Sequence, residues 1–253
     1  MHNDLQKASL WKRIAAGIFD FILITVLATG CAWLLSSVLH YDSYDATLQQ
    51  AYDRYETEYH TTFNITRQTY EAFSPEEKEA YDTAYQALIA DEAAMHAYNM
   101  VVNLMLVITT GAILIAMLLL EFILPLFLGN GQTLGKKVFG IGLMRTDGVK
   151  MNNLQLFTRT VLGKFAVETM IPVYIAFMLF WNMLDLFGVI LVAVLLIVQC
   201  VSILVTRTNS LLHDLMAGTV AVDIGSQMIF RSTEELVAYQ KEIAAERAKR
   251  QSY

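Results

Sequence analysis

The sequence contains little proline, glycine and cysteine, and each shortage excludes a class of protein. Three prolines and 13 glycines in 253 residues argue against a disordered or low-complexity chain. The two cysteines, Cys31 and Cys200, lie in apolar runs with no second cysteine or histidine at metal-ligand spacing, so we expect neither a zinc site nor a disulfide. The sequence has no Ser-His-Asp set, nucleotide fingerprint or intramembrane protease motif. We therefore expect no enzyme, no cofactor and no nucleic-acid binding.

Apolar sequence is abundant instead, and it is concentrated in four long runs. Apolar residues make up 55% of the chain, and the runs begin near Ile14, Met100, Val161 and Leu186. Each run can supply the roughly 20 apolar residues that a helix needs to cross a bilayer. The first run is too long for a signal peptide, and no small-residue cleavage site follows it, so we expect a retained span. The sequence predicts an all-α multi-pass membrane protein with four transmembrane helices.

Charged residues are segregated along the chain, and this segregation predicts the orientation. Lys and Arg are concentrated before the first run, between the second and third runs, and in the tail, whereas residues 40–97 carry twelve acids and three basic residues. By the positive-inside rule, both termini are cytoplasmic and this acidic stretch is extracellular. A short outer link then falls at residues 182–185. An alternative topology divides residues 171–205 differently around Pro172, or makes one run re-entrant.

These features divide the chain into seven segments. They are the N-terminus with the first span (1–40), an extracellular helical hairpin (41–97), the second span (98–128), a cytoplasmic loop (129–159), the third and fourth spans (160–206), a cytoplasmic closing motif (207–225) and a charged cytoplasmic helix (226–253). Ser232, three residues before Glu235, forms a capping-box pattern that predicts the start of the last helix.

The extracellular hairpin is rich in tyrosine and acid. Aromatic and apolar residues recur every seven positions, as in Tyr41, Leu48 and Tyr55, which is heptad spacing. Ser74, followed by proline and two acids, predicts a helix start. We expect the first two spans to extend beyond the membrane as an antiparallel pair that reverses near residues 63–73. The hairpin is then either a solvated spacer or a docking surface, because exposed tyrosines favour interfaces.

The loop after the second span predicts a short cytoplasmic β-hairpin. Residues 138–145 are strand-like, Asp147 and Gly148 form a two-residue turn signal, and residues 149–151 return. A polar turn followed by a second β-prone run, residues 217–223, comes after the fourth span. This recurrence suggests a two-fold internal repeat.

Each apolar run carries one polar residue at membrane depth, namely Asp20, Glu121, Glu168 and Gln199. At 1.5 Å per residue, all four lie about 9–11 Å inside the cytoplasmic boundary. Such groups normally face a protein interior, a water-filled cavity or a partner charge. We predict that the four form one polar layer, and we name them as candidate ion- or proton-binding residues. Pro125, four residues after Glu121, frees the Glu121 backbone carbonyl as an acceptor for an ion or a water.

Basic residues near this layer provide charge-pairing hypotheses. Lys164 lies one helical turn before Glu168 and can pair with it. Asp20 can pair with Lys136 or Lys137 from the cytoplasmic loop. In a structural interpretation, these buried pairs fix the register of the helices. In a functional one, at least one carboxylate lacks a cation and exchanges a proton or binds a cation.

Three phrases along the chain follow a known pattern. Arg13 and Asp20 begin the first span, Gln-Thr-Leu-Gly-Lys-Lys starts at Gln132, and Leu-His-Asp with Asp214 closes the domain. Together they resemble the RDD family of membrane proteins, named for one Arg and two Asp, over roughly residues 8–224. The resemblance implies a small bacterial plasma-membrane protein, and cation/proton exchange has been proposed for some members. Arg13 and Asp214 both fall at the cytoplasmic boundary, so we expect them to pair.

We therefore expect an integral membrane protein that transports a small cation, by proton or sodium exchange, or a small solute through the polar layer. Four helices make a thin wall for a pathway, which suggests a homo-oligomer within the lipid bilayer. The alternative is a non-catalytic partner or regulator of another membrane protein that acts through the extracellular hairpin.

Overall fold

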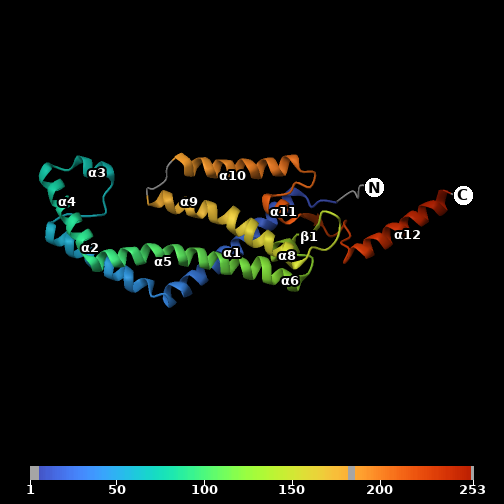
Figure 1. Cartoon of the computed structure of the whole chain (residues 1–253), viewed down its shortest axis with the longest axis horizontal. Helices are drawn as coiled ribbons and strands as arrows, with labels where there is room; N and C mark the ends of the chain where they lie inside the picture. Colours follow the sequence, from blue (N-terminus) through green and yellow to red (C-terminus); the bar gives the residue numbers. More distant parts are fainter. Residues whose placement is uncertain (1–5, 182–185, 252–253) are drawn as a thin grey trace. The chain divides into compact units, whose positions relative to one another are not determined.

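The structure is a computed structural model that describes residues 6–181 and 186–251. It is mostly helical and forms two compact units, one of residues 1–27 and 113–253 and one of residues 28–112. Figure 1 shows the order of the elements. The predicted outer link at residues 182–185 lies outside the described residues.

Four helices are long and apolar enough to cross a membrane, as the sequence predicted. The first is α1 (Leu10–Val38). The second span comprises α5 (Glu92–Met117), η1 (Leu118–Ile123) and α6 (Leu124–Leu128). The third comprises α8 (Asn153–Phe157), η2 (Thr158–Met170) and α9 (Ile171–Phe180), and the fourth lies in α10 (Leu186–Val205). The segments η1 and η2 are π-helices, whose i→i+5 hydrogen bonds widen the turn and which often occur at functional sites.

The unit of residues 28–112 contains the predicted hairpin, built from α2 (Tyr41–Tyr59), α3 (Arg67–Ala72), α4 (Pro75–Ala90) and the start of α5. The predicted reversal coincides with the segment around α3. The helix that we expected to run on from the first span is interrupted at His40, whose φ of 53° is left-handed. The capping box at Ser74 is confirmed, because its Oγ accepts from the Glu77 N–H at 3.2 Å and the Glu77 carboxylate accepts from the Ser74 N–H at 2.7 Å.

Much of the tyrosine in this hairpin packs against the hairpin itself. Leu48 of α2 packs with Val101 of α5, and Tyr52 lies against this cluster. The ring of Tyr81 lies 5.2 Å from that of Tyr70, centre to centre. Internal packing therefore explains much of the aromatic content without a partner.

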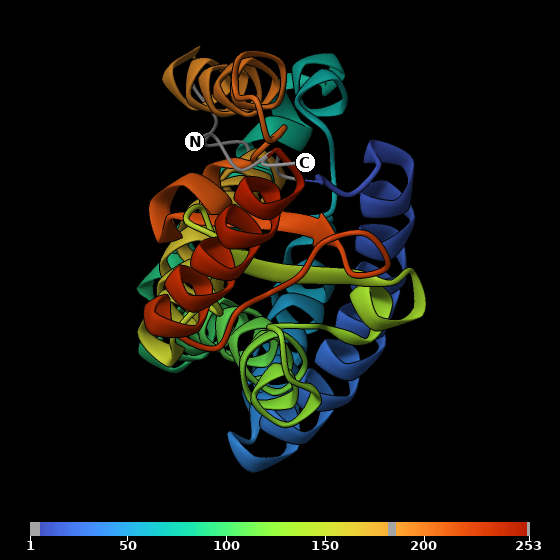
Figure 2. The same ribbon diagram turned by 90° about the vertical axis from the view of Figure 1, so that its right-hand side faces the viewer.

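The two β-prone runs form one small sheet in the other unit. Strand β1 (Ile141–Arg145) pairs antiparallel with β2 (Thr219–Asp223), and Leu143 lies opposite Ala221. Figure 2 shows the two strands side by side. Short helices, α7 (Leu134–Val138) and α11 (Leu212–Ala217), precede the two strands.

The predicted hairpin after the second span forms its turn and only a short return. Gly148 N–H donates to the Arg145 carbonyl at 3.1 Å and Arg145 N–H donates to the Val149 carbonyl at 2.8 Å, but beyond these bonds the return pairs with β1 only through an isolated bridge between Met144 and Lys150. The return is short because Asn152 already caps α8 with a capping box. The full length of β1 pairs with β2 instead. Val220 and Val222 of β2 are fully buried.

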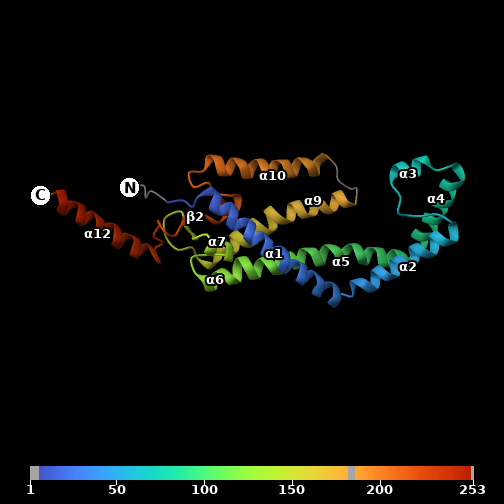
Figure 3. The ribbon, with the colours of Figure 1, turned by 180° about the vertical axis from the view of Figure 1, so that it is seen from behind.

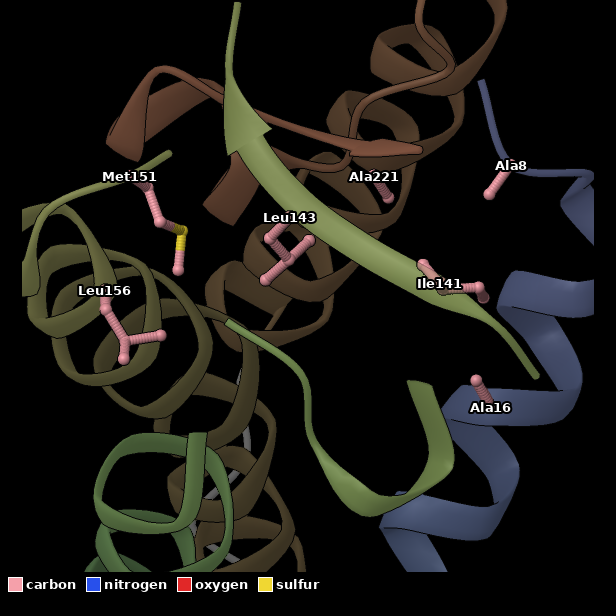
Figure 4. Packing of buried hydrophobic residues seen from close by; sticks show 7 residues of the cluster. All are labelled: Ala8, Ala16, Ile141, Leu143, Met151, Leu156 and Ala221. Atoms are coloured by element: carbon pink, nitrogen blue, oxygen red, sulfur yellow. The ribbon is translucent and has the colours of Figure 1, made fainter. Parts of the chain in front are cut away.

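A small apolar core joins these strands to the spans. Ile141 and Leu143 of β1 pack with Ala16 of α1 and Leu156 of α8 (Figure 4). Helix α7 lies beside the first part of α1 (Figure 3). Gly135 of α7 has to be glycine, because a Cβ would collide with the Ala16 carbonyl oxygen. The predicted C-terminal helix is present as α12 (Thr233–Gln251).

Candidate functional site

A cavity of about 240 Å³ lies within the unit of residues 1–27 and 113–253, and charged side chains form much of its wall. Charged and titratable lining residues come from four elements: Arg13 and Asp20 of α1, Lys136 of α7, Arg159, Lys164 and Glu168 of η2, and His213 of α11. Two of the four residues predicted to share a polar layer therefore line one cavity, and the other two bond to its wall. We call this set the charge network, together with Glu121, Gln199 and Asp214.

Asp20 holds the loop after the second span against the first span. Its Oδ2 accepts from the Thr133 hydroxyl at 2.5 Å, and its Oδ1 accepts from the Gly135 N–H at 2.8 Å. Lys136 Nζ lies 3.8 Å from Oδ2. Of the two lysines predicted as partners, Lys136 is thus the one beside Asp20, whereas Lys137 is exposed.

Glu121 pairs with Lys164, whose Nζ donates to both carboxylate oxygens. The predicted pair of Lys164 with Glu168 is wrong. In the wide turn of η2, a residue no longer stacks on the residue four positions later, and the Lys164 carbonyl instead accepts from the Thr169 hydroxyl at 2.8 Å. Lys164 therefore turns toward the neighbouring span.

The backbone carbonyl freed by Pro125 is occupied by protein. The Thr160 hydroxyl donates to the Glu121 carbonyl at 3.0 Å, and both residues are buried. This hydrogen bond takes the place of the ion or water that we considered from the sequence. It joins η1 to η2 at the level where both are π-helical.

The predicted pair of Arg13 and Asp214 is confirmed, with Arg13 Nη2 donating to Oδ2 at 2.9 Å. A second guanidinium, that of Arg159, donates to Oδ1 from Nε at 3.0 Å and from Nη2 at 2.7 Å. Asp214 is fully buried. Burial alone would raise the pKa of this carboxyl, but Arg159 and Arg13 hold it well below its ordinary value.

His213 connects this centre to Glu168. Its Nδ1 lies 2.8 and 2.9 Å from the two Glu168 carboxylate oxygens, and its Nε2 lies 2.8 Å from Arg159 Nη2. A guanidinium only donates, so Nε2 accepts and the ring proton is on Nδ1. Burial, together with the charge of Arg159, lowers the pKa of His213, which agrees with this neutral tautomer.

Gln199 and Gly163 fix the position of α11. The Gln199 side-chain oxygen accepts from the Leu212 N–H at 3.1 Å, and the Gln199 side chain also hydrogen-bonds Glu168. Gly163 of η2 lies so close to His213 that a Cβ there would meet the His213 backbone. The four polar residues predicted to converge thus reach one network, from four different spans.

The family follows from a comparison of the whole sequence. The RDD family model matches residues 7–218. The chain belongs to the RDD family. No curated protein and no solved structure matched the chain in the corresponding searches. The three residues that match the RDD name have definite contacts, since Arg13 and Asp214 bond each other and Asp20 anchors α7.

Sequence reasoning missed the roles of Arg159 and His213 in the charge network and of Thr133 beside it. Arg159 counted only as one of several loop cations, His213 was considered only as a neighbour of Asp214, and Thr133 was not singled out. The apolar residues that follow Arg159 were an available signal that its side chain enters the span. Among the described residues, no three His, Cys, Asp or Glu side chains gather as metal ligands would.

Proposed function

We propose that this RDD-family protein is a transporter that couples movement of a proton to movement of a small cation or solute. The observation that carries the proposal is the cavity, which opens among spanning helices and has both Asp20 and Lys136 in its wall. An ionisable pair in such a place is costly to maintain and is typical of proton pathways.

Lys136 is the group best suited to exchange the proton. Burial, together with the positive charges of Lys164 and Arg159, lowers its pKa from 10.5 to about 7. A group with this pKa gains and loses a proton readily near neutral pH. When Lys136 is neutral, the charge network loses one positive charge, and a small cation entering the cavity restores the balance.

The charge distribution supports an orientation for this cycle. The basic segments at both ends of the chain and between the second and third spans favour cytoplasmic termini. In the proposed cycle the cavity therefore lies in the cytoplasmic half of a plasma membrane. The family resemblance suggests a bacterial one. In this proposal a second copy of the chain completes the wall of the pathway, because four helices alone make a thin wall.

The test is proton movement in vesicles that contain the purified protein and a pH-sensitive dye. We expect a sodium or potassium gradient to drive proton flux through the wild-type protein, and Asp20→Asn to abolish it. Asp223→Asn is the matched control, because Asp223 makes a more exposed pair with Lys12 at 2.6 Å outside the cavity. Absence of wild-type flux under both gradients and under a set of small-solute gradients would contradict the proposal, as would an active, folded Asp20→Asn variant.

A further inference from the structure

The Thr133 hydroxyl lies between the ammonium group of Lys136 and the carboxylate of Asp20. Its Oγ1 donates to Asp20 Oδ2 at 2.5 Å and accepts from Lys136 Nζ at 3.1 Å. The direct distance from Nζ to Oδ2 is 3.8 Å, which is too long for a hydrogen bond. An ammonium only donates and a carboxylate only accepts, so the hydroxyl is aligned in one direction, from lysine to aspartate.

We propose that Thr133 is a proton relay between Lys136 and Asp20, an inference that rests on the proposed function. Lys136 Nζ gives a proton to Thr133 Oγ1 while the proton already on Oγ1 passes to Asp20 Oδ2. One N–H bond and one O–H bond break, and two O–H bonds form. The products are a neutral amine, a regenerated hydroxyl and a neutral carboxylic acid, so the net charge of the three groups stays the same.

The surroundings favour such a transfer. Charged groups face Lys136 from three elements: Asp20 from α1, Glu121 from η1, and Lys164 and Arg159 from η2. Burial and the two like charges favour the neutral amine, whereas the two carboxylates favour the ammonium, so the two protonation states are brought closer in free energy. Asp20 and Lys136 both line the cavity, which allows either group to exchange its proton there.

The position of the hydroxyl keeps water from replacing it. The Thr133 side chain is 2% exposed and is not part of the cavity wall. Water in the cavity can reach the lysine and the aspartate, but the short path between them passes through this buried oxygen. Proton transfer by a positioned group typically contributes about 10²–10⁴-fold to a rate.

Thr133 also has a structural role, because its Oγ1 accepts from the Lys136 N–H at 3.3 Å and caps α7. Three substitutions separate the two roles. Thr133→Ser keeps the cap and the hydroxyl. Thr133→Asn has a similar volume and is an equally good helix cap, but an amide does not relay a proton. Thr133→Val removes both.

The experiment measures proton flux against pH in vesicles, together with thermal unfolding in detergent. We expect Thr133→Ser to retain flux near the wild-type rate with the wild-type pH profile. Thr133→Asn should remain as stable as the wild type yet lose flux by about 100-fold, and Thr133→Val should lose both flux and stability. Wild-type flux and pH profile in a folded Thr133→Asn protein would overturn the relay.

A second measurement distinguishes failure of the relay from failure of the transport proposal. Acetic anhydride labelling of the Lys136 amine, followed by mass spectrometry across pH, reports its titration in purified protein without any transport. We expect Asp20→Asn to shift this titration strongly when Thr133 is present and less in a Thr133→Asn background, which keeps the helix cap. Equal shifts in the two backgrounds would overturn the relay, whether or not the vesicles show flux.

Discussion

In the unit of residues 28–112 charged side chains pair at the surface, whereas the other unit has, besides surface pairs, charged pairs buried in its interior. In the unit of residues 28–112, Arg67 and Glu71 lie 2.9 Å apart with side chains 91% and 61% exposed. In the other unit, Asp214 is fully buried between two guanidiniums. Surface pairs contribute little, because water and salt screen them, whereas a buried charge that loses its partner is severely destabilising. The contrast separates charges exposed on the hairpin from buried charges that hold the elements of the other unit together.

The largest effect should come from Asp214→Asn. This change leaves the positive charges of Arg13 and Arg159 without a counter-charge, and we expect a loss of about 3–5 kcal/mol in the free energy of unfolding. Denaturant unfolding in detergent measures it. Glu71→Gln is the matched surface control and should change stability little. An equal loss in the free energy of unfolding for the two substitutions would contradict the distinction between buried and surface charge pairs.

The pair of Arg13 and Asp214 could be predicted from the sequence, as could the four spans. A run long enough to cross a bilayer is recognised by its length, and counting residues from its charged end predicts a similar depth for Asp20, Glu121 and Glu168. The cap at Ser74 was likewise local. The spans and the cap depend on neighbouring residues only, so a single sequence is sufficient to predict them. The pair of Arg13 and Asp214, 201 residues apart, followed instead from the expectation that both lie at the same membrane boundary.

Other parts of the network depend on geometry that the sequence does not encode locally. Lys164 pairs with Glu121 rather than with Glu168 because η2 is π-helical. The residue types of η2 alone favour an ordinary helix, in which Glu168 lies one turn from Lys164. Strand β1 pairs with a strand more than 70 residues later in the chain rather than with its nearest return. Arg159 is one of several loop cations in the sequence, and only the fold brings it against Asp214.

A smaller effect should come from Gly135→Ala, which tests how closely α7 fits against α1. The added Cβ would collide with the Ala16 carbonyl oxygen and crowd the Asp20 carboxylate, and backbone atoms cannot move aside easily. We expect a loss of about 1–3 kcal/mol in stability, typical of overpacking, together with loss of flux. Gly17→Ala in α1 is the control, because a Cβ there meets nothing within 4 Å. Unchanged stability and flux in the Gly135→Ala variant would show that α7 does not fit this closely against α1.

A further effect should be a dependence of stability on pH that comes from Lys136. Its pKa is lowered on folding from 10.5 to about 7, so the unfolded chain binds more protons between these values. Stability should therefore rise as the pH increases above 7. Lys136→Met should flatten this rise, which a series of thermal melts between pH 7 and 9 would detect. The same slope in wild type and variant would mean that Lys136 keeps an ordinary pKa.

The central claim is that charged groups from different spans meet and pair in one network, and a charge swap tests it most directly. We expect Lys164→Glu and Glu121→Lys each to destabilise the protein in detergent, and the double variant to recover most of the lost stability, because the two side chains bond each other. Rescue of Lys164→Glu by Glu168→Lys instead, with no rescue by Glu121→Lys, would contradict the account.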